Sequence, residues 1–269
     1  MSKKTIFITG SSTGLGRATA KLFAERGWNV IATMRNPEKE TELGQLPGIK
    51  LLALDVTNPA QIEQAAREAL AAGPVDVVLN NAGYGLVGPV EAQEDEQIVA
   101  VINTNLLGTI RTTKAFIPAF RERGSGIFIA TTSIGGHLTY PFNSAYHATK
   151  WALEGWCESV AFELAPFGIR VKTVAPGAIK TDFVSRSLVL VQHHAYTERL
   201  NKLVGMFRHG LEAETASTSE QIAEVIWEAA TDGKDQVLYL AGADAKGIIA
   251  QRLSMGAEAF RKMISSAFG

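Results

Sequence analysis

Short apolar runs alternate with amphipathic helical patterns along most of the chain. Runs such as Ile6–Ile8 and Ile127–Ala130 are continuously apolar, which is typical of strands in a parallel sheet that is covered on both faces. Between such runs, Gly14–Arg26 and Pro59–Ala72 show helical spacing, and Asn58 and Pro59 have the residue types favoured at an N-cap and first helical position. The alternation predicts an α/β fold: a doubly wound parallel sheet with helices on both faces.

The remaining apolar runs extend this pattern. They predict further strands at 30–32, 51–54, 75–79, 169–174 and 237–240, and helices within 94–123 (one or two), over 144–164, over 219–230 and after Asp244. The stretch Phe183–Gly210 is less regular, with apolar clusters at 188–191 and 203–207. Because no internal repeat or linker interrupts the pattern, we expect a single domain over residues 1–269.

Composition excludes several classes of function. The 269 residues carry a net charge of −1 and no basic run longer than Lys3-Lys4, which argues against nucleic acid or an anionic membrane as the partner. Cys157 is the single cysteine, so an intrachain disulfide is impossible; its apolar neighbours indicate a core residue. No run reaches the ~20 apolar residues of a membrane span, and the N-terminus lacks the features of a signal peptide. A cytoplasmic protein is expected.

A glycine-rich turn follows the first predicted strand and opens the first predicted helix. Glycines let the backbone approach a pyrophosphate closely, and a helix N-terminus supplies free N–H groups and a positive dipole end. A strand before and a helix after the turn are the context that dinucleotide binding requires. The sequence therefore predicts a nucleotide-binding turn at Gly10, Ser12, Thr13, Gly14, Leu15 and Gly16.

The end of the second strand indicates which dinucleotide is bound. An acidic side chain there would bond to the ribose 2′-hydroxyl of NAD, whereas an arginine would accommodate the 2′-phosphate of NADP. Residues 32–35 contain no carboxylate and end in Arg35, and Ser12 is available as a hydroxyl donor. We therefore expect NADP(H) rather than NAD(H).

Tyr146 and Lys150 stand four residues apart in a predicted helix, so their side chains share one face. An ammonium beside a phenol stabilises the phenolate and lowers the phenol's pKa from about 10 toward neutrality. Such a phenol can exchange a proton with a carbonyl or alcohol at physiological pH. Alone the spacing is weak evidence, because a tyrosine and a solvated lysine often lie four apart on a helix.

Taken in order, the motifs resemble those of the short-chain dehydrogenase/reductase superfamily over about residues 6–182. The match includes the glycine turn Thr9–Gly16, Asn80–Gly83 after the fourth strand and Pro176-Gly177 after the sixth. Thr131-Thr132-Ser133 stands where relatives often carry Asn-x-Ser-Ser, but it keeps the serine. The segments Ala32–Pro37 and Gly242–Lys246 look like the branch with 17β-hydroxysteroid and retinol dehydrogenase-like enzymes. The resemblance implies a Rossmann-type fold.

The resemblance also implies the site residues. Ser133 would donate a hydrogen bond to the substrate oxygen, and Tyr146 would act as general acid or base. Lys150 would hold the nicotinamide ribose and lower the pKa of Tyr146, and Asn105 would position a water that relays protons from Lys150. The further cofactor contacts it implies, beyond the glycine turn and Arg35, are Asp55, Val56, Asn81, Ala82, Gly83, Tyr146, Lys150, Pro176, Gly177, Ile179 and Thr181.

The expected substrate is a hydrophobic ketone, aldehyde or secondary alcohol. In the superfamily the segment after Pro176-Gly177 covers the substrate, and here the segment near 183–210 is rich in Leu and Val. Two alternatives stay open: a 3-oxoacyl thioester reductase, and a dinucleotide-binding sensor without catalysis. His193-His194 has no third ligand at a recognisable spacing, so no metal is expected. Relatives are mostly homodimers or homotetramers that pack their long helices across subunits, so a homo-oligomer is expected here.

Overall fold

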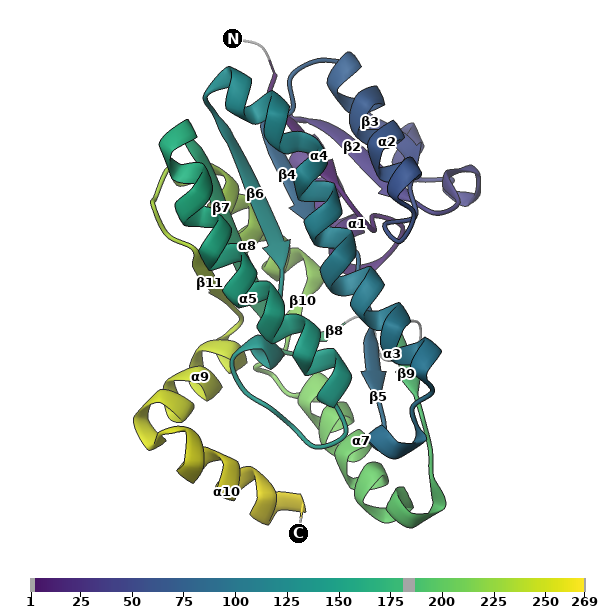
Figure 1. Ribbon diagram of the computed structural model, residues 1–269, viewed down its shortest axis with the longest axis vertical. Helices are drawn as coiled ribbons and strands as arrows, with labels where there is room; N and C mark the ends of the chain where they lie inside the picture. The colour runs from purple at the N-terminus through teal and green to yellow at the C-terminus, as the bar shows by residue number, and fades with distance from the viewer. Residues whose placement is uncertain (1–2, 181–186, 269) are drawn as a thin grey trace.

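A parallel sheet of seven strands forms the centre of the computed structural model, which describes residues 3–180 and 187–268 (Figure 1). The strand order is β11-β7-β6-β4-β1-β2-β3, and every neighbouring pair is parallel. The strands are β1 (Thr5–Ile8), β2 (Asn29–Met34), β3 (Ile49–Ala53), β4 (Val77–Asn80), β6 (Gly126–Thr131), β7 (Ile169–Pro176) and β11 (Leu238–Ala241).

Helices cover both faces of this sheet. On one face lie α1 (Gly14–Glu25) and α8 (Ser219–Thr231); on the other lie α2 (Pro59–Ala71), α4 (Gly108–Arg123) and α5 (Ser144–Leu164). Successive side chains of a strand point to opposite faces of the sheet. Because Ile6, Phe7 and Ile8 of β1 are all apolar, both faces must be covered by helices. Ile6 and Ile8 pack into the core with α1 and α8, whereas Phe7 packs into the core with α2, α4 and α5.

The other elements gather beyond the carboxyl ends of the strands (Figure 1). Two pairs of short parallel strands lie outside the main sheet: β5 (Gly85–Val87) with β9 (Leu188–Leu190), and β8 (Ile179–Lys180) with β10 (Ser217–Thr218). The helices outside the two layers are α3 (Asp95–Ile102), α7 (Thr197–Glu212), α9 (Ala243–Met255) and α10 (Ala257–Phe268). They place apolar side chains next to the end of the sheet where the predicted site residues lie.

The predicted fold class is confirmed. The helix predicted over 144–164 has those bounds, and the Asn58 side chain caps α2 by accepting from the N–H groups of Ala60 (3.0 Å) and Gln61 (3.2 Å). Residues 94–123 hold two helices, α3 and α4, within the predicted one or two, and a π-helical turn η4 (Asn103–Leu107) joins them. The region after Asp244 is more divided than predicted, because two helices there are separated at Gly256, whose φ is +80°.

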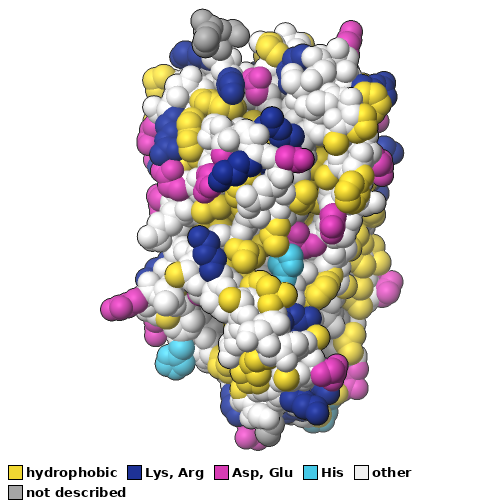
Figure 2. Space-filling view, turned by 90° about the vertical axis from the view of Figure 1, so that its left-hand side faces the viewer, with side chains coloured by type: hydrophobic (Ala, Val, Ile, Leu, Met, Phe, Trp, Pro, Cys, Tyr) yellow, Lys and Arg dark blue, Asp and Glu magenta, His cyan; other side chains and the backbone are white. Residues whose placement is uncertain are grey.

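The surface carries both signs of charge. Figure 2 shows Lys and Arg side chains interspersed with Asp and Glu on the face that it presents. Across the described ranges, no helix combines the length and apolar character that crossing a membrane requires.

Candidate active site

The predicted site residues lie at the carboxyl ends of neighbouring strands. The glycine turn follows β1, Asn81–Gly83 follow β4, Ser133 follows β6, and Pro176 ends β7. In the sheet β1 lies between β2 and β4, so the chain leaves β1 in one direction and later returns on its other side. In open α/β sheets a ligand binds in the crevice at such a switch point. The fold therefore brings the predicted segments to one crevice.

The glycine turn has the geometry of an anion-binding helix start. Gly10 has φ +70°, and a Cβ there would lie 2.9 Å from Cα of Ala82; a Cβ on Gly16 would collide with the Gly10 carbonyl oxygen. Thr13 is the N-cap of α1 without a side-chain cap, and the first turn carries no acidic residue. Because the first N–H groups of a helix lack partners within it, this turn fits a pyrophosphate.

Thr9 joins the glycine turn to the segment after β4. Its buried hydroxyl oxygen accepts hydrogen bonds from the backbone N–H groups of Asn81 and Ala82, both at 3.0 Å. In return, Nδ2 of Asn81 donates to the carbonyl oxygens of Thr9 and Gly10, both at 3.1 Å. The Asn81 side chain thus braces the turn rather than facing the crevice with free donors. Sequence reasoning assigned no role to Thr9, although a threonine ending a buried strand beside glycine is a recognisable signal.

The expected adenine end of the crevice contains a second arginine that the sequence did not single out. Arg35 and Ser12 are exposed. Arg17 donates to the carbonyl oxygen of Ser12 at 3.0 Å and pairs with Glu40 (2.7 Å) and Glu42 (2.6 Å). Arg17 is therefore largely neutralised, which leaves Arg35 as the better candidate for a phosphate.

Asp55 and Val56 have structural contacts in this structure. Oδ1 of Asp55 accepts from the backbone N–H (2.9 Å) and hydroxyl (2.7 Å) of Thr57, which closes the turn before α2. Val56 is buried, and a Cβ on Gly108 would lie 3.0 Å from its side chain. These contacts hold the turn before α2 in place. Contact of Asp55 or Val56 with the adenine ring of a cofactor stays a prediction.

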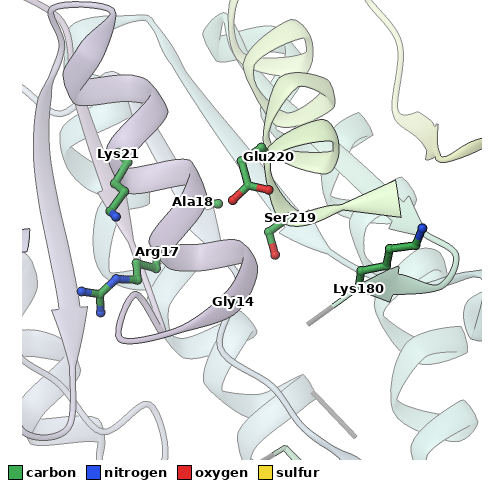
Figure 3. Close-up of a pocket in the computed structure, with 7 residues that line it drawn as sticks. All are labelled: Gly14, Arg17, Ala18, Lys21, Lys180, Ser219 and Glu220. Atoms are coloured by element: carbon green, nitrogen blue, oxygen red, sulfur yellow. The ribbon is translucent and has the colours of Figure 1, made fainter. Parts of the chain in front are cut away.

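A hollow of about 300 Å³ opens beside the glycine turn (Figure 3). Arg17 and Lys21 extend from α1 on one side and Lys180 from β8 on the other, with the start of α8 between them. Its lining residues are Gly14, Arg17, Ala18, Lys21, Lys180, Ser219 and Glu220. Arg17 and Lys21 are paired with Glu40 and Glu42, so the charge of this lining alone does not select an anionic ligand.

Lys150 is buried among the other predicted site residues. Its side chain is 6% exposed, Nζ donates to the Thr131 carbonyl oxygen at 2.9 Å, and Nζ lies 5.7 Å from the centre of the Tyr146 ring. A Cβ on Gly83 would lie 3.1 Å from Oδ1 of Asn105 and 3.8 Å from Nζ of Lys150. The structure therefore brings Tyr146, Lys150 and Asn105 together, with the Gly83 backbone between the last two.

Ser133 occupies the turn between β6 and α5. It is the N-cap of the 3-10 turn η5 (Ile134–Gly136), where its Oγ accepts from the Gly135 N–H at 3.0 Å. This bond uses the oxygen as an acceptor and leaves the hydroxyl proton for donation. The Ser133 hydroxyl also lies near enough to Tyr146 to lower the pKa of its phenol. The hydroxyl groups of Ser133 and Tyr146 could thus both donate a hydrogen bond to one substrate oxygen.

The proton affinities differ from the expected pattern. Burial raises the pKa of Tyr146, and the nearby Ser133 hydroxyl only partly opposes this shift. Burial also lowers the pKa of Lys150 to about 8, against the charge of Glu154. The pKa of Tyr146 is therefore raised in this structure rather than lowered toward neutrality as expected, because removing the phenol from water disfavours its charged form.

Asn105 lies in the π-helical turn and braces its neighbours. Nδ2 donates to the Tyr84 carbonyl oxygen (2.9 Å) and to Oγ1 of Thr149 (3.2 Å), and Oδ1 accepts from the Tyr84 N–H (3.0 Å). Both N–H groups of the side chain are used. A water bound by Asn105 would therefore have to donate to an oxygen of Asn105. The side chain has no N–H group left for a proton relay to use.

The segment after β7 is held by a residue that sequence reasoning missed. Oδ2 of Asp244 accepts from the Ala178 N–H at 2.6 Å, and a Cβ on Gly177 would collide with this carboxylate. Ile179 begins β8, while Thr181 lies outside the described residues. Pro176 ends β7 and Gly177 follows it, and the Asp244 carboxylate packs against this segment.

Comparison with known proteins supports the same assignment. A model of the short chain dehydrogenase family matches residues 4–188. The chain is 34% identical over 260 residues to human 17-beta-hydroxysteroid dehydrogenase type 1, covering 89% of this chain and 77% of the relative.

Two solved structures align over almost the whole chain. A short-chain dehydrogenase from Streptomyces avermitilis has a TM-score of 0.85 and 33% identity over 98% of this chain and 96% of its own. One from Burkholderia cenocepacia in complex with NADP has a TM-score of 0.78 and 27% identity over 97% of each chain. The chain thus belongs to the short chain dehydrogenase family and is an oxidoreductase that acts on CH–OH or C=O groups with a nicotinamide cofactor.

Proposed function

We propose that the enzyme uses NADP(H) to interconvert a hydrophobic ketone or aldehyde and its alcohol, with Tyr146 as general acid or base. The observation that carries the proposal is the grouping of Ser133, Tyr146 and Lys150 at the crevice beside the glycine turn. The bound nicotinamide would supply or accept the hydride.

The side chains divide the remaining work. In reduction, the carbonyl oxygen gains negative charge, which a hydrogen bond from Ser133 would stabilise. Because the pKa of Tyr146 is raised, its phenol is protonated at neutral pH and ready to donate to that oxygen. Lys150 would contribute positive charge and hold the cofactor ribose, while Asn105 would keep Tyr84 and α5 in place.

The cofactor preference rests on the end of β2. Arg35 is exposed there, Ser12 of the glycine turn is exposed as well, and residues 32–35 carry no carboxylate. A planar guanidinium suits a phosphate. The relative from Burkholderia cenocepacia is described in complex with NADP, which agrees with a preference for NADP(H).

The apolar cluster beyond the sheet supports a hydrophobic substrate. Segments from four parts of the chain contribute to it: β5, the loop before α5, the 188–207 region and α10. Its members are Val87, Tyr140, Phe142, Leu188, Leu200, Leu203, Phe207, Ile264 and Phe268. We infer that residues 1–269 act as one domain, in which the segment near 183–210 covers the substrate. The human relative's name, a hydroxysteroid dehydrogenase, fits a large apolar ketone.

A substrate panel tests the proposal. Purified enzyme is given NADPH with steroid and aryl ketones, apolar aldehydes and 3-oxoacyl thioesters, and the loss of NADPH is followed. We expect turnover of the free ketones or aldehydes. Much faster turnover of the thioesters would favour a 3-oxoacyl thioester reductase instead. Tight NADPH binding with no turnover of any carbonyl would favour the sensor.

Location and assembly stay predictions from the sequence: a cytoplasmic enzyme that forms a homodimer or homotetramer. Trp151 and Phe162 of α5 are exposed, which fits packing of the long helices across subunits. Sedimentation equilibrium would measure the subunit number.

A further inference from the structure

A third residue continues the face of α5 that carries Tyr146 and Lys150. Glu154 stands four residues after Lys150, so the three side chains lie along one side of the helix. Glu154 is only 14% exposed, and burying a carboxylate is costly unless it is paired or hydrogen-bonded. The family resemblance gave it no role, and the proposed chemistry does not use it.

Both carboxylate oxygens of Glu154 contact other elements. Oε1 lies 3.1 Å from Nε2 of His137, which follows the turn η5, and Oε2 accepts a hydrogen bond from the buried Thr173 of β7 at 2.9 Å. The carboxylate therefore joins α5 to a central strand and to the turn that carries Ser133.

The packing around Gly136 shows how closely this turn fits the helix. A Cβ on Gly136 would lie 2.9 Å from the Lys150 carbonyl oxygen and 3.0 Å from Cγ of Glu154. Glycine thus lets η5 rest against the helix at both residues. The position of Ser133 relative to Lys150 depends on this contact and on the Glu154 carboxylate, which lies against the His137 ring.

The charge of Glu154 also acts on Lys150. Burial lowers the pKa of Lys150, and the nearby carboxylate opposes that shift. The other titratable groups around the pair are Tyr146, His147 and Cys157 of α5 and His137 after η5. Burial raises the pKa of Cys157 and lowers that of His147 to about 4, so both are uncharged at neutral pH. From β7, Lys172 is instead paired with Asp232.

We propose that Glu154 is a positioning residue, which fixes the Ser133 turn against α5 and places its carboxylate one helical turn from the buried Lys150 ammonium. The inference rests on the proposed function for its effect on turnover. Its effect on the ionisation of Lys150 can be measured without any substrate.

The experiment compares wild-type enzyme with Glu154→Gln and with the control Glu158→Gln. The control makes the same change one turn further along α5, at an exposed position. The protein is labelled with ¹³C at the lysine ε-carbons, and the Lys150 signal is assigned by its loss in Lys150→Arg. Its NMR titration then gives the protonation midpoint of Lys150 directly.

Glu154→Gln should lower the Lys150 midpoint by about 0.5–1 pH unit, and Glu158→Gln should leave it unchanged. In the plot of kcat against pH, the alkaline limb of Glu154→Gln should shift to lower pH by the same amount. At pH values above the midpoint, kcat of this variant should therefore be about 3- to 10-fold lower than that of wild type. An unchanged midpoint in Glu154→Gln would overturn the proposal.

Two further variants separate charge from position. Glu154→Asp keeps the charge and should retain the wild-type midpoint, and it tests the proposal if Glu154→Gln does not fold. A drop in the Asp variant equal to that in the Gln variant would refute the charge effect. Thr173→Val removes one hydrogen bond to the carboxylate but no charge, so it should lower kcat while leaving the midpoint unchanged; an unchanged kcat would refute the positioning role.

The two proposals fail in different ways. If the wild-type enzyme reduces no carbonyl but the Lys150 midpoint still drops in Glu154→Gln, only the proposed function is refuted. If carbonyl reduction is normal and Glu154→Gln has the same Lys150 midpoint and pH profile as Glu158→Gln, only the role of Glu154 is refuted.

Discussion

Replacing Thr9 with valine removes one hydroxyl group from the junction between the glycine turn and the segment after β4. Valine has nearly the same shape as threonine, so packing against β4 is preserved. The hydroxyl accepts from the N–H groups of Asn81 and Ala82, both at 3.0 Å, and the Thr9 side chain is buried. The substitution therefore leaves two backbone donors without their acceptor.

The expected cost follows from those two donors. An N–H group that loses its partner in a buried site costs about 1–3 kcal/mol. Asn81 and Ala82 are only half-buried, so the lower half of that range applies to each. The free energy of unfolding should fall by about 2–4 kcal/mol in total. For a chain of this size this lowers Tm by about 2–4 °C per kcal/mol.

Thermal unfolding with and without NADPH measures the effect. Thr231→Val is the matched control, because its hydroxyl donates only to the Trp227 carbonyl oxygen of its own exposed helix end. Thr9→Val should also weaken NADPH binding, since the glycine turn loses its brace. A Thr9→Val protein as stable as the Thr231→Val control would refute the bracing role.

Three further predictions address the cofactor, the acid response and the core. Arg35→Ala should weaken NADPH binding by about 1.5–3 kcal/mol and NADH binding much less, and equal losses in calorimetry would remove the NADP assignment. Burial lowers the pKa of His147 from 6.5 to about 4, so the unfolded state binds more protons between these values and stability falls as pH drops through that window. His147→Gln should recover up to about 3 kcal/mol of this loss in denaturant titrations at pH 4, whereas His209→Gln, at an exposed site, should recover none. Lys172→Met leaves the Asp232 carboxylate, 2.8 Å from Lys172 Nζ, without its cation and should cost about 3–5 kcal/mol; adding Asp232→Asn should restore part of it, and no restoration would refute the pairing argument.

The central sheet and its helices could be predicted because their signals are local. A short, continuously apolar run such as Ile127–Ala130 is typical of a doubly covered strand, and Asn58-Pro59 marks a helix start by residue type alone. The elements that were missed depend on distant partners. Gly85 pairs with Leu188 across the β5–β9 ladder, and neither segment carries a strand pattern long enough to show this.

The sequence identified the candidate site residues, but it did not predict their pKa shifts or the hydrogen bonds that hold them. The ordered motifs identified Ser133, Tyr146 and Lys150, and the fold places them at one crevice. The direction of the Tyr146 pKa shift depends on how much water the folded chain excludes, which spacing along a helix does not reveal. The bracing contacts of Thr9 and Asn105 likewise come from segments that meet only in three dimensions.

The most direct test of the account is the rate of NADPH-dependent reduction of a reactive apolar ketone by wild-type enzyme and by Tyr146→Phe. Loss of the phenol proton donor should lower kcat about 10²- to 10⁴-fold, while the Kd for NADPH stays within about threefold because the ring and Lys150 remain. A Tyr146→Phe enzyme that keeps its kcat within a factor of two of wild type would contradict Tyr146 as the acid–base residue.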